Sequence, residues 1–176
     1  MRIRTGSIAV LSALLACSGE KSKTSDIQQA NAAELPASPA ISNAAAAKGD
    51  CDASLWNHVY NPTRLKKIST CLNVTGVIVE SSADDDGDQH FLLKLDPGQD
   101  KLVNKRNAKK KGGDLVLEIV CANPIKLKKV KSACAGYTNR IPIPAVGTHV
   151  RATGTYVIDS HNGWAEIHPV SILQPI

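Results

Sequence analysis

The segment LNVTGVIVESSADDDGDQHFLLKLD, residues 72–96, decides the fold. Its first part is rich in β-branched residues. In its last part successive side chains would fall on opposite faces of a strand, with Phe91 and Leu95 on the same face. Both runs are typical of β-strands, and the acidic, glycine-containing stretch between them is typical of a turn. We therefore predict a β-hairpin with strands over 72–82 and 90–96.

Three further strands are predicted downstream of this hairpin. LVLEIVC, residues 115–121, aligns Leu115, Leu117 and Ile119 on one face of a strand. GTHVRATGTYVID, 147–159, is joined to GWAEIHPVSIL, 163–173, by a short polar turn, so these two form a second hairpin. The polar and basic residues 97–114 are expected to form a loop. Residues 122–147 contain three prolines without clear periodicity and are expected to form a long excursion.

Five strands in this order suit a small barrel of the oligonucleotide/oligosaccharide-binding (OB) type, and an open meander is the alternative. Gly76 and Gly154 fall inside predicted strands, where a closed barrel bends sharply. Upstream, Asp52 or Ser54 can cap a short helix that ends before Pro62. Because only 3% of the residues are aromatic, the core should be aliphatic. The predicted class is mostly β with a short N-terminal helix.

The N-terminus has the layout of an export signal. Arg2 and Arg4 precede an apolar run too short to cross a bilayer as a helix, and this run ends in LLAC. LLAC resembles the lipobox of bacterial lipoproteins, which implies that Cys17 becomes the lipidated first residue. Ser18 after it resembles the sorting signal for the outer membrane. An ordinary secretory signal, in which Cys17 is incidental, is the alternative.

The chain should therefore be divided into three parts. Residues 1–16 are predicted to be a lipoprotein signal peptide, and residues 17–48, rich in Ala, Ser, Asn and Pro, a flexible tether. Residues 49–176 are predicted to fold as the barrel domain. The expected location is the bacterial cell envelope, on the outer membrane facing the periplasm or the cell surface, with the lipid on Cys17 as the membrane partner.

Four more cysteines follow the tether. Their even number in an exported chain favours two disulfides, for which three pairings are open. We predict the pairs Cys51–Cys71 and Cys121–Cys134, because each closes one local segment. A metal site is the alternative, but no CxxC spacing supports it.

Charge is distributed unevenly along the chain. The net charge is +5, and lysines crowd residues 101–111 and 126–131, opposite the acidic run that ends at Asp88. Basic runs can bind nucleic acid or anionic lipid. No aromatic residues alternate with these lysines to stack on bases, so solvated loops are the favoured interpretation. The acidic run matches a calcium-binding loop only loosely, and a solvated turn is predicted there.

The segments CDASLWNHVYNPTRLKKISTCLNVTGVI, DGDQHFLLKLD and GWAEIHPV together are similar to a group of small bacterial secreted domains. That group carries Cys, Trp and Tyr-Pro near the start, DGD before a histidine, and E-[IL]-H-P-V at the end. The resemblance spans about residues 51–173 and implies a barrel-like fold. It implies no particular activity, because the role of that group is unsettled.

The candidate ligand-binding residues gather in the last strand. Trp164, Glu166 and His168 should share one face of this strand, whereas Ala165 and Ile167 point into the core. On the outer face the α-carbons of Glu166 and His168 would be about 7 Å apart, close enough to converge on one ligand.

Asp88 and His90 stand in the same two-residue relation on the second strand. A divalent metal ion could draw on Asp88, His90, Glu166 and His168, since imidazole and carboxylate suit zinc and similar ions. No other cofactor is predicted, and the metal ligands stay open. The structural alternative is that these side chains are solvent-exposed or locally hydrogen-bonded, with Pro169 ending the sheet at an edge.

Two functional classes remain open at this stage. The first and favoured class is a membrane-tethered, non-catalytic binding or accessory module of unknown ligand, because no nucleophile with a nearby base is identifiable. The second is a metal-dependent, nuclease-like hydrolase on the same type of barrel, with Arg151 on the fourth strand as the arginine placed to hold a phosphate. Nucleic acid and polysaccharide are candidate partners without a supporting motif, and no protein partner is predicted.

Overall fold

The structure, a computed structural model, describes residues 51–176. The predicted signal peptide, lipidation at Cys17 and tether lie outside these residues. The described part is mostly β, as predicted, and none of its helices is long and apolar enough to span a bilayer. Its five strands are β1 (Leu65–Ala83), β2 (Gln89–Leu95), β3 (Leu115–Ile119), β4 (His149–Asp159) and β5 (Ala165–Pro175).

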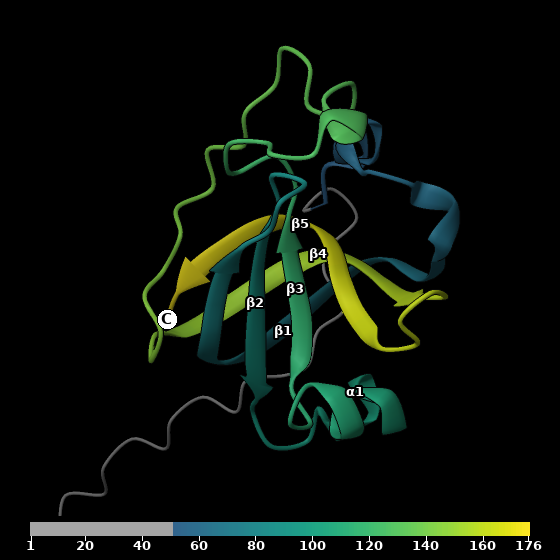
Figure 1. Cartoon of the computed structure of the whole chain (residues 1–176). Helices are drawn as coiled ribbons and strands as arrows, with labels where there is room; N and C mark the ends of the chain where they lie inside the picture. The colour runs from purple at the N-terminus through teal and green to yellow at the C-terminus, as the bar shows by residue number, and fades with distance from the viewer. Residues whose placement is uncertain (1–50) are drawn as a thin grey trace, which may run out of the picture. The chain divides into compact units, whose positions relative to one another are not determined.

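The strand pairings close in a ring, in the order β1-β2-β3-β5-β4 (Figure 1). β1 pairs antiparallel with β2 and β4, β2 pairs antiparallel with β3, and β4 pairs antiparallel with β5. Only β3 and β5 are parallel, so the sheet is mixed. The chain therefore crosses from β3 to β4 through the long excursion before it returns to pair β5 with β3.

Aliphatic side chains fill the interior of the barrel. The predicted alignment of Leu115, Leu117 and Ile119 is confirmed, because these side chains of β3 are buried in the same cluster as Phe91 and Leu93 of β2. Ala165 and Ile167 of β5 join this cluster, as predicted. Thirteen buried residues form this core. Phe91 is its single aromatic residue, so burial of aliphatic area supplies most of its hydrophobic stabilisation.

Gly76 in β1 and Gly154 in β4 lie where neighbouring strands come very close. A Cβ atom on Gly76 would overlap the backbone carbonyl of Lys94 on β2, and one on Gly154 would overlap the carbonyl oxygen of Pro169 on β5. Both glycines are thus required by close strand packing, in agreement with the prediction from their place in the sequence.

A second, smaller cluster covers part of the outside of the barrel. The predicted helix is a 3-10 helix, η1 (Ala53–His58), capped by Asp52, whose carboxylate accepts the Ser54 N–H at 2.8 Å. η1 packs Leu55 onto outward-facing residues of β4 and the end of β3, together with Tyr137 of the excursion. The cluster's buried members are Leu55, Val59, Leu65, Val120, Cys121 and Val157.

Both predicted disulfides are present. Cys51–Cys71 joins the segment before η1 to β1, and Cys121–Cys134 joins the end of β3 to the excursion. Each bond closes a local segment, with sequence separations of 20 and 13 residues. The two disulfides attach η1 and the excursion, which cover the outside of the barrel, to the strands.

The prediction of a loop over 97–114 was wrong in part. This segment contains a 3-10 helix, η3 (Asp100–Leu102), and an α-helix, α1 (Lys105–Lys110), which lies at one end of the barrel (Figure 1). A capping box between Asn104 and Asn107 starts α1. α1 is held by contacts outside its own segment, since the Asn107 side chain accepts from Ala165 N–H and donates to its carbonyl, at 2.8 and 2.9 Å.

The alternative in which Pro169 ends the sheet was wrong. β5 continues to Pro175, and Pro169 instead lies at an irregularity in the pairing of β4 with β5, between the pairs Tyr156–Ile167 and Gly154–Val170. Here β5 has one residue more than β4. The outward-facing Glu166 lies just before this bulge and His168 lies within it.

Candidate functional site

Glu166 and His168 lie on the predicted strand face but are not exposed to solvent. Their exposed fractions are 0% and 1%, and Asp88, predicted to be in a solvated turn, is 4% exposed. Solvent exposure, the first form of the structural alternative, is wrong because η1 and the Cys121–Cys134 excursion cover this side of the barrel. The second form, a local hydrogen bond, is present between His168 and Glu166. Burial of a charged group is costly unless it is paired, so these residues must satisfy one another.

Four buried ionisable side chains form what we call the inner cluster: Asp88, Glu118, Glu166 and His168. His168 is at its centre. Its Nδ1 lies 2.9 Å from Glu118 Oε2 and 3.2 Å from Glu166 Oε1. Trp164 Nε1–H donates to Glu166 Oε2 at 2.8 Å and so fixes the second carboxylate. The imidazole is therefore oriented by two carboxylates from neighbouring parallel strands.

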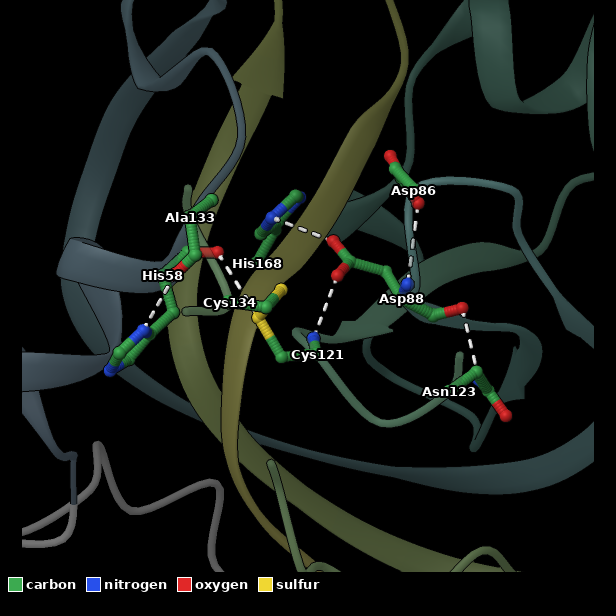
Figure 2. Close-up of a disulfide and its surroundings, with 8 residues drawn as sticks. All are labelled: His58, Asp86, Asp88, Cys121, Asn123, Ala133, Cys134 and His168. Carbon is green, nitrogen blue, oxygen red and sulfur yellow. Dashed lines mark hydrogen bonds and ion pairs between the residues drawn. A yellow bond between two sulfur atoms is a disulfide. The ribbon is translucent and has the colours of Figure 1, made fainter. Parts of the chain in front are cut away.

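The other ring nitrogen of His168 faces Asp88 (Figure 2). Nε2 lies 3.9 Å from Asp88 Oδ2, which is too long for a hydrogen bond, and it has no hydrogen-bond partner among the described residues. Asp88 Oδ1 accepts the Cys121 N–H at 2.8 Å, so this carboxylate is held in place by the backbone next to the disulfide. A gap thus separates two fixed, buried polar atoms.

The inner cluster shifts the acidities of its members. Burial raises the pKa of Asp88 to about 7, and the charge of His168 only partly offsets this. Burial also raises the pKa of Glu166, with a further contribution from the charge of Glu118. Burial opposes ionisation of Glu118, but the charge and hydrogen bond of His168 hold its pKa well below the usual value.

His168 completes this pattern. Burial alone would lower its pKa, but the two carboxylates at Nδ1 raise the pKa well above the usual value. At neutral pH the cluster therefore contains an imidazolium paired with the Glu118 carboxylate, and Glu166 carries the higher carboxyl pKa of the two glutamates.

Next to the inner cluster lies a polar cavity of about 260 Å³, which we call the outer cavity. Glu118 belongs to both sites, since its Oε1 lies 3.7 Å from His90 Nδ1 in the cavity wall. Three segments distant in sequence meet around the cavity: the turn from β1 to β2, the end of α1, and the turn from β4 to β5. The principal lining residues are Arg64, Asp84, His90, Lys111, Glu118 and Trp164.

Lys111 joins the two sides of the outer cavity. Its ammonium lies 4.2 Å from the centre of the Trp164 ring and 3.3 Å from His90 Nε2. Because an ammonium group only donates hydrogen bonds, the proton of a neutral His90 is on Nδ1, toward the carboxylates of Asp84 and Glu118. The cavity thus has a fixed cation against an aromatic face, with carboxylates opposite.

Five of the six predicted ligand-binding residues are brought together. Asp88, Glu166 and His168 belong to the inner cluster, and His90 and Trp164 line the outer cavity. Arg151 is not part of either site. It is exposed on β4, six residues before the partner of Glu166 in the β4–β5 pairing, or roughly 20 Å along the strand.

Sequence reasoning missed Glu118, Arg64 and Lys111. Glu118 had a signal: it stands in LVLEIVC between Val116 and Val120, so both faces of this strand are apolar. An acid in such a position is buried and needs a partner. Arg64 and Lys111 are brought to the cavity by tertiary contacts, including the 3.1 Å ion pair of Arg64 with Asp159, and no local pattern reveals them.

The inner cluster has the donor set of a divalent-metal site. One ligand atom each from Asp88, Glu118 and His168 lie within 4.8 Å of one another, and all three residues are buried. Two carboxylates and an imidazole suit zinc, manganese and similar ions. His90, included in the metal set predicted from the sequence, belongs to the cavity wall and not to this group.

No model of a known protein family matches the chain, and no curated protein matches it significantly. The functional interpretation therefore depends on the fold and on the two adjoining sites.

Proposed function

We propose that the protein is a binding module of the bacterial cell envelope, tethered through a lipid on Cys17, with an OB-type barrel whose ligand occupies the outer cavity. OB barrels bind their ligands on the face of strands 2 and 3, between the loop that joins strands 1 and 2 and the loop that joins strands 4 and 5. The outer cavity occupies this place: His90 belongs to β2, Glu118 to β3, Asp84 to the first of these loops and Trp164 to the second. This coincidence of position carries the proposal.

The charges of the cavity favour a saccharide over a nucleic acid as the ligand. Carboxylates outnumber fixed cations in the lining, and a phosphodiester backbone would be repelled by them. Sugar hydroxyls, by contrast, can donate to carboxylates and accept from Arg64 and Lys111, while Trp164 offers apolar surface. The lining acids are Glu80, Asp84, Asp86 and Glu118.

Two lysine variants test the ligand site. Lys111 and Lys67 each stack on a tryptophan, at 4.2 and 3.5 Å from the ring centre, but only Lys111 lines the outer cavity. We expect Lys111→Ala to weaken binding of soluble peptidoglycan fragments about tenfold or more in calorimetry, and Lys67→Ala to leave it unchanged. Equal effects of the two substitutions, or tighter binding to a DNA oligonucleotide than to the glycan, would refute the saccharide proposal.

The tether has its own test. Replacing Cys17 with alanine should move the protein from the membrane fraction to the soluble fraction of the envelope, because the cavity and barrel supply no membrane anchor in this proposal. An unchanged membrane fraction would refute lipidation at Cys17 and leave the ligand site unaffected.

A metal-dependent hydrolase is the second candidate. It is favoured by Arg64, which lines the cavity together with Glu118, so that an arginine and a carboxylate of the metal-like group border the same space. Incubation of the purified protein with a polynucleotide and Mn²⁺ or Zn²⁺ distinguishes it from a binding module. Cleavage that is lost in Glu118→Gln would establish the hydrolase, and intact polynucleotide would refute it for this substrate class.

A further inference from the structure

We propose that the inner cluster binds one divalent transition-metal ion, with His168 Nε2 and one oxygen each of Asp88 and Glu118 as ligands. This proposal concerns the buried cluster behind the outer cavity and does not require the saccharide ligand. It starts from two independent observations: the convergence of three ligand atoms within 4.8 Å, and a buried imidazole nitrogen without a hydrogen-bond partner among the described residues.

The unpartnered nitrogen is the stronger of these observations. The His168 side chain is 1% exposed, so water does not readily compensate Nε2 for a missing partner. A buried polar atom left unpaired costs about 1–3 kcal/mol. Nε2 faces Asp88 Oδ2 at 3.9 Å, a separation that two ligands of one ion with bonds of about 2.1 Å can span.

The groups around the ligands match the usual second shell of a metal site. A ligating histidine typically donates its other ring N–H to a carboxylate, which fixes the ring and leaves the remaining nitrogen for the ion. His168 Nδ1 lies 3.2 Å from Glu166 Oε1 and 2.9 Å from Glu118 Oε2, and Trp164 holds the other oxygen of Glu166 at 2.8 Å. Asp88 is fixed in turn by the Cys121 N–H, which occupies Oδ1 and leaves Oδ2 facing Nε2 (Figure 2).

The charge of the inner cluster and its access from solvent are also consistent with a bound metal ion. Three carboxylates surround one imidazole in a largely buried volume, and a divalent cation would compensate their negative charge. The ion would take the place of the Nε2 proton, which is released on binding. Glu118 also lines the outer cavity, so the cavity gives a route from solvent to the cluster. The imidazole ligand favours zinc over calcium or magnesium.

The test uses the full-length protein purified in detergent, stripped with EDTA and then titrated with Zn²⁺. We expect one Zn²⁺ per chain in elemental analysis after desalting. Asp88→Asn should weaken the binding at least 100-fold, since even second-shell changes cost about 10–100-fold in affinity. Trp164→Phe, which removes the hydrogen bond to Glu166 but keeps an aromatic ring, should weaken it about tenfold.

Matched controls come from the same protein. His149 and Asp96 form another histidine–carboxylate pair, at 2.9 Å, but it is partly exposed and lies at the ends of β4 and β2 away from the cluster. His149→Gln should leave Zn²⁺ affinity unchanged. Asp85→Asn controls for the loss of one acid from the turn that contains Asp88. If Zn²⁺ binds equally to the wild type and Asp88→Asn, or is lost in His149→Gln, the proposal is refuted.

A second measurement keeps the proposal falsifiable where a buried substitution prevents folding. The chain contains five histidines, and NMR of the wild-type imidazole signals during the titration reports on each one. Only the His168 ring is expected to shift strongly at one equivalent of Zn²⁺. Shifts confined to other histidines, or no shifts, would overturn the assignment, while the proposed saccharide site would stand or fall by its own lysine variants.

Discussion

Asp88→Asn should change the pH dependence of stability in a defined window. The Asp88 carboxyl is 4% exposed, and its burial raises the pKa in the folded protein to about 7, against 3.8 for a free side chain. Between these values the folded protein keeps a proton that the unfolded chain releases. The contribution of Asp88 to the free energy of unfolding is therefore fully present below pH 4 and is lost as the pH rises toward 7.

The size of the effect follows from the two pKa values. Each pH unit in this window corresponds to about 1.4 kcal/mol for one group, so Asp88 removes up to about 4 kcal/mol of folding free energy between pH 4 and pH 7. The new amide does not titrate, and it retains the oxygen that accepts the Cys121 N–H at 2.8 Å. The stability of Asp88→Asn relative to the wild type should therefore increase as the pH rises.

Urea denaturation at intervals from pH 4 to pH 7.5, with EDTA throughout, measures this difference. We expect the free energy of unfolding of Asp88→Asn minus that of the wild type to increase by about 2–4 kcal/mol across the range. The control Asp85→Asn removes an acid from the same turn, but Asp85 is exposed and its side chain pairs with Lys126 at the surface. The difference in free energy of unfolding between this variant and the wild type should therefore stay nearly constant across the pH range. A flat difference for Asp88→Asn would refute the raised pKa.

Three other variants test the framework of the site. Replacing both Cys121 and Cys134 with serine should lower the free energy of unfolding by about 3 kcal/mol, because the bond closes a loop with a sequence separation of 13, and an unchanged urea midpoint would contradict this. Asn107→Ala removes two buried hydrogen bonds to the start of β5 and should cost about 2–4 kcal/mol; wild-type stability would show that α1 does not hold β5. Gly154→Ala forces a methyl group against the Pro169 carbonyl and Ile167 and should cost about 1–3 kcal/mol in thermal melts, and full stability would disprove the close packing.

The strands could be predicted because their signal is local. Alternation along a strand places Phe91 and Leu93 on one face of β2, and Ala165 and Ile167 on one face of β5, independently of distant segments. All four residues lie in the core. The disulfide pairing could be predicted for a similar reason, since the closure of a short segment depends little on distant structure. α1 could not, because its six residues are too few to form an isolated helix. It depends on the contact of Asn107 with Ala165, 58 residues away.

Burial of the candidate site also depends on distant segments. The residues that cover the outside of the barrel come from η1 and from the excursion after β3, and both are fastened by disulfides. Alternation correctly placed Glu166 and His168 on the outer face of β5. It could not show that other segments bury this face. The same residue pattern predicts a solvated pair on an open barrel and a low-dielectric ion cluster on a covered one.

Glu118 makes the two sites interdependent. One of its oxygens lies 2.9 Å from the buried imidazole of His168, and the other lies 3.7 Å from His90 in the cavity wall. A change of charge behind Glu118, whether a proton or a metal ion at His168, alters how strongly this carboxylate attracts a donor in the cavity. By linkage, a cavity ligand that donates to Glu118 must change the affinity of the inner cluster for its proton or ion by the same factor. Zn²⁺ titrations with and without saturating glycan measure that factor, and a value of one would show that the two sites act separately.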